Sequence, residues 1–178
     1  TVVKRLVQDY GYSLSISATT RAPREGEVDG REYYFKTKED FMNLIDYNGF
    51  IEWAVYVENY YGTPRAFVEK ELAAGHNVIL EIEVQGAMNI KEQYPDAILI
   101  FLTAPSAAEL RKRLVGRGTE EAAVIEKRMQ RAVEESANME SYEYIVVNDE
   151  NSVIVARGCM IEENKEFMKQ MKAELKAL

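Results

Sequence analysis

The chain contains 178 residues, of which 47% are apolar and 29% are charged. A chain of this length buries roughly 70% of the surface that its unfolded form exposes, which is enough for one core. This composition excludes a disordered chain, and the sequence has no apolar run approaching the ~20 residues of a membrane span. The net charge of −8 argues against nucleic acid or an anionic membrane as a partner, because both attract a positive surface.

Cysteine and histidine are too scarce for two common kinds of site. The single cysteine, Cys159, excludes an intramolecular disulfide, and the single histidine, His76, excludes a zinc cluster of cysteines and histidines. A reducing environment fits this usage, so we expect a cytoplasmic protein.

The first half of the chain predicts short elements of both kinds. Apolar residues spaced as on one helix face predict a helix over 1–10, which Gly11 ends. The elements expected next are a strand at 13–17, a loop over 18–32, a strand at 33–35, a helix over 38–47, a strand at 50–57 and a helix that begins at Thr63-Pro64 and ends at Gly75.

The second half is more regular. Unbroken apolar runs at 78–80, 98–102 and 145–147 predict strands that are buried on both faces. Helical patterns cover 84–93, 106–115, 120–139 and about 151 to the end. This alternation predicts an α/β fold with a parallel sheet and right-handed crossovers, and the aromatic-rich segment 18–75 is expected to be a small inserted subdomain.

Two arginines stand three residues apart in a proline-stiffened loop. Arg21 and Arg24 are suited to hold one phosphate or carboxylate, because guanidinium groups form paired hydrogen bonds with such anions. The alternative is that both are solvated surface arginines.

Two carboxylates follow the apolar run 78–80. The two-residue period of a strand predicts Glu81 and Glu83 on one face, at the carboxyl end of a parallel strand, where open α/β sheets bind ligands. Such acids need a cation, a metal or a donor-rich ligand. Alternatively, the strand end simply emerges into water.

Basic residues cluster between positions 111 and 131 of this acidic chain. Arg113 and Arg117 share one helix face, and Gly116 and Gly118 beside Arg117 suit a hinge. A mobile flap that carries arginines is typical of phosphoryl transfer. The alternative is ion pairing with nearby glutamates such as Glu109.

A tyrosine pair precedes the helix that Pro64 begins. The hydroxyls of Tyr61 and Thr63, together with Glu52 on the preceding strand, suit the polar edge of a ring. The alternative is that the tyrosines lie at the edge of a core.

Taken in chain order, these segments resemble the guanylate kinase family, whose members transfer a phosphoryl group from ATP to GMP. The matching segments are SATTRAPREGEVDG at 17–30, FIEW at 50–53, NYYGT at 59–63, EIEVQG at 81–86, LVGRGTE at 114–120 and VVND at 146–149. The resemblance runs from residue 1 to about 149. It implies a P-loop nucleoside-monophosphate-kinase-like core in a single domain, 1–178, with core segments 1–17, 76–115 and 140–178, a GMP-binding subdomain over about 18–75 and a helical lid over about 116–139.

The resemblance also assigns roles at matching positions. It assigns the GMP phosphate to Ser17, Arg21, Arg24, Tyr33 and Tyr61, and the guanine base to Glu52, Thr63 and Glu83. It places Glu81 in the substrate site near the metal and the phosphates. It assigns phosphoryl transfer to Arg113, Arg117 and Arg128, and ATP binding to Thr1 and Asn148. It implies Mg²⁺ bound with ATP and no direct side-chain ligand to the metal.

The guanine assignment agrees with the chemistry of the base. Guanine offers N1–H and N2–H₂ donors beside an O6 acceptor. A carboxylate such as that of Glu52 accepts from the two donors, and the hydroxyl of Thr63 donates to O6. Adenine reverses this pattern, which predicts discrimination of ~10²-fold or more in a buried site. We therefore expect GMP or dGMP as the phosphoryl acceptor.

The resemblance further implies a glycine-rich phosphate-binding loop immediately before Thr1, and no segment of the sequence replaces it. We expect that this segment belongs to the native protein and that the 178-residue chain binds GMP without turning over ATP. Two other functions remain open. One is a non-catalytic guanylate-kinase-like module that binds phosphopeptides in the GMP site, and the other is a kinase for a different nucleotide.

Overall fold

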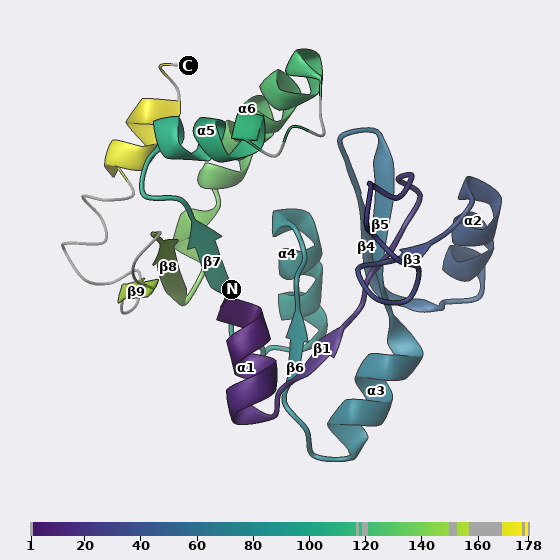
Figure 1. Cartoon of the computed structure of the whole chain (residues 1–178). Helices are drawn as coiled ribbons and strands as arrows, with labels where there is room; N and C mark the ends of the chain where they lie inside the picture. Colours follow the sequence, from purple (N-terminus) through teal and green to yellow (C-terminus); the bar gives the residue numbers. More distant parts are fainter. Residues whose placement is uncertain are drawn as a thin grey trace. The chain divides into compact units, whose positions relative to one another are not determined.

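The computed structural model describes residues 2–116, 118, 121–149, 153–156, 169–175 and 177. The chain forms two compact units, Thr1–Pro95 and Asp96–Leu178. Helices alternate with strands in both, and parallel strand pairs occur in both (Figure 1). The predicted α/β class with parallel strands and flanking helices is confirmed.

The first unit contains four helices and six strands among its described residues. They are α1 (Val2–Tyr10), β1 (Ser13–Ser15), β2 (Ala18–Thr19), β3 (Tyr34–Phe35), α2 (Lys38–Asp46), β4 (Phe50–Tyr56), β5 (Asn59–Pro64), α3 (Arg65–Ala73), β6 (Val78–Leu80) and α4 (Val84–Gln93). Strand β1 pairs in parallel with β6, and a second sheet has the order β3-β2-β5-β4. Figure 1 shows β4 and β5 as a long hairpin with α2 beside it.

Helix α2 covers one face of the four-stranded sheet. Thr37 caps its N-terminus, where the hydroxyl accepts from the backbone N–H of Asp40 at 3.0 Å. Phe41 of the helix is fully buried and stacks on Phe50 of β4 with ring centroids 4.4 Å apart. This apolar contact occupies one face of the hairpin, and a register shift between Phe50 and Glu52 turns Glu52 to the opposite face.

Several predicted bounds in this unit are wrong. Residues 18–19, expected in a loop, form β2, and residues 59–64, expected to lead into a helix, form β5. Both strands are short and lack strong local signals. Strand β2 forms because it pairs with the distant β5, whereas β5 forms because it folds back on β4, which directly precedes it in a hairpin. The helix that follows has Pro64 as its N-cap and Gly75 beyond its C-cap at φ +79°, as expected.

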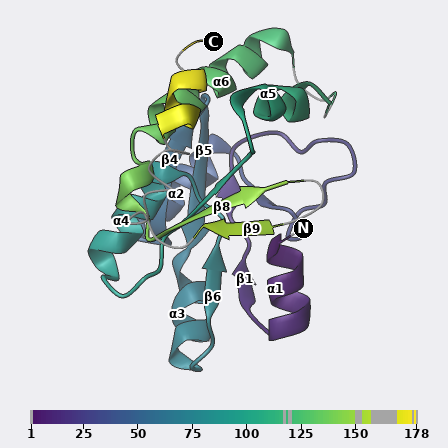
Figure 2. The same ribbon diagram turned by 90° about the vertical axis from the view of Figure 1, so that its left-hand side faces the viewer.

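The second unit packs its helices around one core. Its elements are β7 (Ile100–Thr103), α5 (Ala107–Gly116), α6 (Ala122–Ser136), η1 (Met139–Ser141), β8 (Tyr144–Asn148) and β9 (Val153–Ala156). The core joins buried side chains of α5, α6, η1, β8 and the helical residues 169–175. Strand β8 lies between β7, which is parallel to it, and β9, which is antiparallel (Figure 1). Figure 2 shows β8 and β9 side by side, with their arrows in opposite directions.

Two expectations for this unit are wrong. The helix predicted from about residue 151 to the end is wrong at its start, where residues 153–156 form a strand because this apolar run pairs with β8, and is confirmed at residues 169–175, which are helical. Strand β7 is not buried on both faces: Phe101 packs against the core, whereas Ile100 and Leu102 are 53% and 51% exposed. The described helices of this unit cover only the face that carries Phe101. None of the helices that the structure describes is both long and apolar enough to cross a membrane.

Candidate functional site

A buried carboxyl–hydroxyl pair lies at the centre of the β4–β5 hairpin. Glu52 on β4 is directly opposite Thr63 on β5, and the Thr63 hydroxyl donates a 2.5 Å hydrogen bond to Oε1 of Glu52. Glu52 is 6% exposed and Thr63 is fully buried. The sheet register thus brings together two of the predicted guanine-binding residues.

The protonation of Glu52 is set by its surroundings. The pKa of Glu52 is raised to about 7, mainly by burial; the Thr63 hydrogen bond lowers this pKa in part, and the neighbouring Glu83 carboxylate contributes to raising it. Near neutral pH the carboxyl therefore exists in both protonation states. Such an environment suits a carboxyl group whose ionised form is stabilised by the hydrogen-bond donors of a bound ligand.

The third predicted guanine-binding residue approaches from α4. Strand β6 ends at Leu80, so the strand alternation predicted for Glu81 and Glu83 does not apply to them. Glu83 is instead the N-cap residue of α4 and acts electrostatically on Glu52. Glu81 acts on Tyr33, and the pKa of its own carboxyl is raised by partial removal from water. The two acids thus serve different parts of the site.

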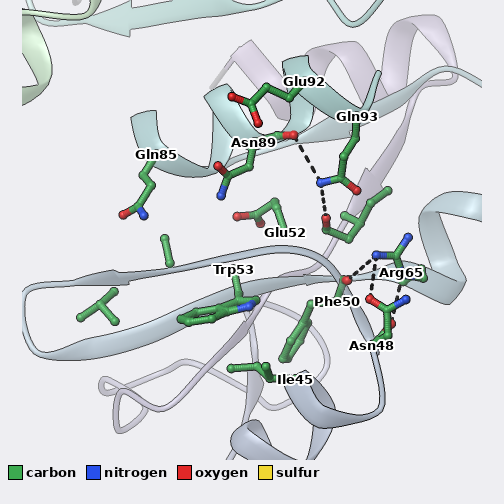
Figure 3. Close-up of a pocket in the computed structure, with 13 residues that line it drawn as sticks. Ile45, Asn48, Phe50, Glu52, Trp53, Arg65, Gln85, Asn89, Glu92 and Gln93 are labelled. Carbon is green, nitrogen blue, oxygen red and sulfur yellow. Dashed lines mark hydrogen bonds between the residues drawn. The ribbon is translucent and has the colours of Figure 1, made fainter. Parts of the chain in front are cut away.

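A pocket of about 680 Å³ adjoins Glu52 at the free edge of β4 (Figure 3). One wall is α4 and the other is β4, with Trp53 on the strand side. The side chain of Gln93 donates a 2.9 Å hydrogen bond to the backbone carbonyl of Ile51, which ties α4 to the strand that carries Glu52. Most of the polar lining comes from α4, namely Gln85, Asn89, Glu92 and Gln93.

The predicted arginine pair converges on a carboxylate of its own loop. Arg21 donates from Nη2 to both oxygens of Glu27 at 3.0 Å, and Nη1 of Arg24 lies 3.9 Å from Oε1 of Glu27. The Arg21 side chain is only 13% exposed, so the alternative of a solvated surface arginine is wrong for this residue. Burial alone would raise the pKa of Glu27, but bonds from Arg24 and Arg21 outweigh it and hold that pKa below its usual value.

Two aromatic rings also contact the guanidinium of Arg21. Its guanidinium lies 5.4 Å from the ring centre of Tyr33 and 5.8 Å from that of Phe35. Tyr33 meets Tyr61 edge to face at 6.0 Å. Tyr61 and Thr63 are two residues apart on β5 and therefore lie on the same face of the strand. The arginine–tyrosine group and the Glu52–Thr63 pair thus share one face of the sheet.

The two tyrosines lie on opposite faces of β5, and Ser17 is buried. Tyr60 points to the opposite face and packs against Phe41, so it is a core-edge residue, whereas Tyr61 is not. Ser17 is buried before β2, and its carbonyl accepts from the N–H of Tyr34 at 2.9 Å. The first unit therefore presents an anion-binding group and a carboxyl–hydroxyl pair on connected elements.

Three residues predicted for ATP binding and phosphoryl transfer, Arg113, Arg128 and Asn148, are described in the second unit. Arg113 on α5 donates to Glu109 at 2.8 Å and to the backbone carbonyl of Asn148 at 2.8 Å. The ion-pair alternative thus describes Arg113 in this state, and the same bonds bring Arg113 and Asn148 together. Arg128 is partly buried on α6. Arg117 and Thr1 lie outside the described residues.

Two residues of the site were missed by reasoning from the sequence. Glu27 holds both arginines, and Gly86 lies against the carboxylate of Glu52. Both stand inside the quoted motifs, at 17–30 and 81–86, but no local pattern marks them. A carboxylate three residues after an arginine is common on any surface, and a helical glycine gives no indication of what it contacts.

The fold and site define an α/β protein in which a buried carboxyl–hydroxyl pair, Glu52 and Thr63, shares one face of a sheet with an arginine–tyrosine group. The guanylate kinase family model matches residues 1–157. Curated relatives include a guanylate kinase of Halalkalibacterium halodurans, 52% identical over 149 residues (84% of this chain and 73% of the relative). Another is from Caldanaerobacter subterraneus subsp. tengcongensis, 42% identical over 183 residues (98% and 89%).

Solved structures agree with the sequence comparisons. The crystal structure of guanylate kinase from Anaplasma phagocytophilum superposes with a TM-score of 0.69 at 30% identity, over 99% of this chain and 79% of that one. The family model covers far more than half of the chain, and the relatives are matched over most of their length. The chain belongs to the guanylate kinase family.

Proposed function

We propose that this protein transfers the γ-phosphoryl group of ATP to GMP or dGMP and forms ADP and GDP or dGDP. Family membership supports the reaction, and the observation that supports the acceptor is the buried Glu52–Thr63 pair. Guanine presents two adjacent N–H donors beside the O6 acceptor, which is the complement of one carboxylate and one hydroxyl.

Binding of guanine exchanges hydrogen bonds at this pair. Without ligand, the Thr63 hydroxyl donates to Glu52. With guanine bound, N1–H and N2–H₂ donate to the Glu52 carboxylate, and the Thr63 hydroxyl is released to donate to O6. Every buried polar atom of the pair keeps a partner, so the exchange leaves no unsatisfied group. Glu83 supplies a further carboxylate at the edge of the base.

In this proposal the GMP phosphate binds to the arginine–tyrosine group. Arg21 is already oriented by Glu27 and by two aromatic rings, so little side-chain freedom remains to be lost when the phosphate binds. Arg24, Ser17, Tyr33 and Tyr61 complete the proposed phosphate site. All of them except Ser17, which directly precedes it, belong to a GMP-binding subdomain over about 18–75.

Phosphoryl transfer is mostly a matter of positioning and of charge stabilisation. We assign the charge stabilisation to Arg113, Arg117 and Arg128 of a lid over about 116–139 and its preceding helix, and the ATP contacts to Thr1 and Asn148. The described residues contain no group of three or more side chains suited to a metal ion. Following the family resemblance, Mg²⁺ bound with ATP would be held mainly by ATP phosphates and water, with Glu81 as the nearby carboxylate, and would neutralise phosphate charge.

A non-catalytic phosphopeptide module is the competing function. A peptide has no need of a fully buried threonine that donates to a buried glutamate, whereas a purine ring does. We also propose a cytoplasmic location, because the single cysteine of the 178 residues leaves no intramolecular disulfide to form.

Calorimetric titration of this chain with GMP, dGMP, AMP and a phosphoserine peptide tests the acceptor. We expect GMP and dGMP to bind and AMP to bind at least ~10²-fold more weakly. ATP-dependent formation of GDP from GMP by the native protein tests the reaction. Tighter binding of the peptide than of GMP, or a native protein that forms no GDP, would contradict the proposal.

A further inference from the structure

We propose that Gly86 is a positioning residue for guanine selection, because only a residue without a side chain lets the Glu52 carboxylate occupy its place. The inference rests on the proposed function, since it concerns how the base is read. It assigns a role to α4 that the contacts of Glu52 with its own sheet do not reveal.

The space beside Gly86 is already filled by the carboxylate. A Cβ atom at this position would lie 2.4 Å from Oε2 of Glu52, 3.1 Å from its Cδ and 3.5 Å from Oε1 of Glu83. The nearest of these distances is far below van der Waals contact. Any side chain at position 86 therefore competes with the carboxylate that accepts from the base.

Backbone geometry does not explain the glycine. Gly86 is the third residue of α4, and it is not among the residues with positive φ. Glycine is less favourable than alanine inside a helix, so helix formation alone would favour alanine here. The remaining reason for glycine is the close approach of Glu52.

The carboxylate has little freedom to retreat. Its other oxygen is held by the Thr63 hydroxyl at 2.5 Å, and Glu52 is 6% exposed. On the helix side, Gln93 lies seven residues after Gly86, about two turns along the same face, and bonds the carbonyl of Ile51 beside Glu52. Helix and strand are therefore tied together, and an added methyl group meets a fixed neighbour.

The expected displacement is large for a recognition site. Oε2 must move about 1 Å away to restore the 3.4 Å of ordinary contact. Recognition geometry tolerates roughly 0.5 Å, so a displaced carboxylate loses part of its bond to guanine. The N2–H₂ and N1–H donors need both oxygens in place, whereas inosine monophosphate, which lacks the 2-amino group, depends on one bond fewer.

The test is a double-mutant cycle of Gly86→Ala and Glu52→Asp, read as calorimetric binding of GMP and IMP. Gly86→Ala should weaken GMP binding by roughly tenfold or more and reduce the ratio of GMP to IMP affinity. Aspartate is shorter by one methylene and withdraws from position 86, so in the Glu52→Asp background the added methyl should change GMP affinity much less.

Gly49→Ala is the matched control. Its Cβ would lie 3.1 Å from Leu44 side-chain and backbone atoms, so it perturbs packing in the same unit without touching a carboxylate. It should alter stability and leave the ratio of GMP to IMP affinity unchanged. If Gly86→Ala alone does not fold, Glu52→Asp should restore the fold of the double variant.

The outcomes separate the two proposals. The role of Gly86 would be overturned if Gly86→Ala weakened GMP and IMP binding equally or weakened neither. It would also be overturned if the effects of Gly86→Ala and Glu52→Asp on GMP affinity were additive. A Gly86→Ala protein that stays unfolded in the Glu52→Asp background would overturn it as well. A wild-type chain that does not bind GMP would instead contradict the proposed function.

Discussion

Replacing Glu52 with glutamine removes a titrating group from a buried position and should make the free protein more stable at alkaline pH. Burial and the Glu83 carboxylate raise the pKa of Glu52 from 4.5 to about 7. Between these two pH values the folded state binds a proton that the unfolded state has released. The free energy of unfolding of the wild type therefore falls as the pH rises from about 4.5 to about 7.

The size of the effect follows from the shift. Each pKa unit corresponds to 1.36 kcal/mol, so raising the pKa from 4.5 to about 7 places the penalty for an ionised Glu52 at about 3 kcal/mol. Glutamine is neutral and nearly the same size, and its carbonyl still accepts from Thr63. We expect Glu52→Gln to match the wild type near pH 4.5 and to exceed its stability by about 3 kcal/mol at pH 8.

Urea unfolding followed by tryptophan fluorescence measures this difference. Trp53, the single tryptophan of the chain, lies beside Glu52 on β4. Glu83→Gln is the companion variant, since it should lower the pKa of Glu52 and move the transition to lower pH. A stability difference between wild type and Glu52→Gln that does not change from pH 5 to pH 8 would refute the reasoning.

The same group should control the pH dependence of GMP binding. The ionised carboxylate accepts from guanine, so wild-type affinity should rise as the pH increases through about 7. The GMP phosphate also gains charge near pH 6, and this contribution remains in Glu52→Gln. The variant should bind GMP weakly, and its affinity should show only the phosphate part of the pH dependence.

Three further predictions concern other parts of the first unit. Thr63→Val removes the hydroxyl that lowers the pKa of Glu52, so GMP binding should weaken by roughly tenfold and its rise with pH should move to higher pH, as calorimetry at several pH values would show. Arg21→Lys loses the paired bonds to Glu27 and should weaken GMP binding while leaving guanosine binding unchanged; equal losses for both ligands would contradict this role. Thr37→Ala removes the cap of α2 and should lower the free energy of unfolding by about 1 kcal/mol in urea, with GMP affinity preserved.

Local sequence patterns predicted the helices well. The helix predicted at 84–93 is α4 residue for residue, the one predicted at 38–47 differs from α2 by one residue at its end, and the one predicted at 1–10 agrees with α1 at every described residue. A helical pattern repeats within a few residues, and the end signals Gly11 and Gly75 each stand directly beside the helix that they end. They act within the element itself, so the sequence alone contains them.

Short strands depended on their partners. Residues 18–19 form β2 through pairing with β5, tens of residues further along the chain, and residues 59–64 form β5 because they fold back on β4 in a hairpin. Residues 153–156 form a strand because β8 lies beside them. Strand formation requires hydrogen bonds to another segment. A pattern read along one segment does not identify that partner.

The candidate site divides in the same way. Residue types and the resemblance of the motifs singled out Glu52, Thr63 and Arg21 from the sequence by itself. The tertiary structure decided the raised pKa of Glu52, the hold of Glu27 on the arginines and the close approach of Gly86. Burial, charge proximity and the space for a Cβ atom depend on residues brought together from β4, β5 and α4, and these distances exist only once the chain has folded.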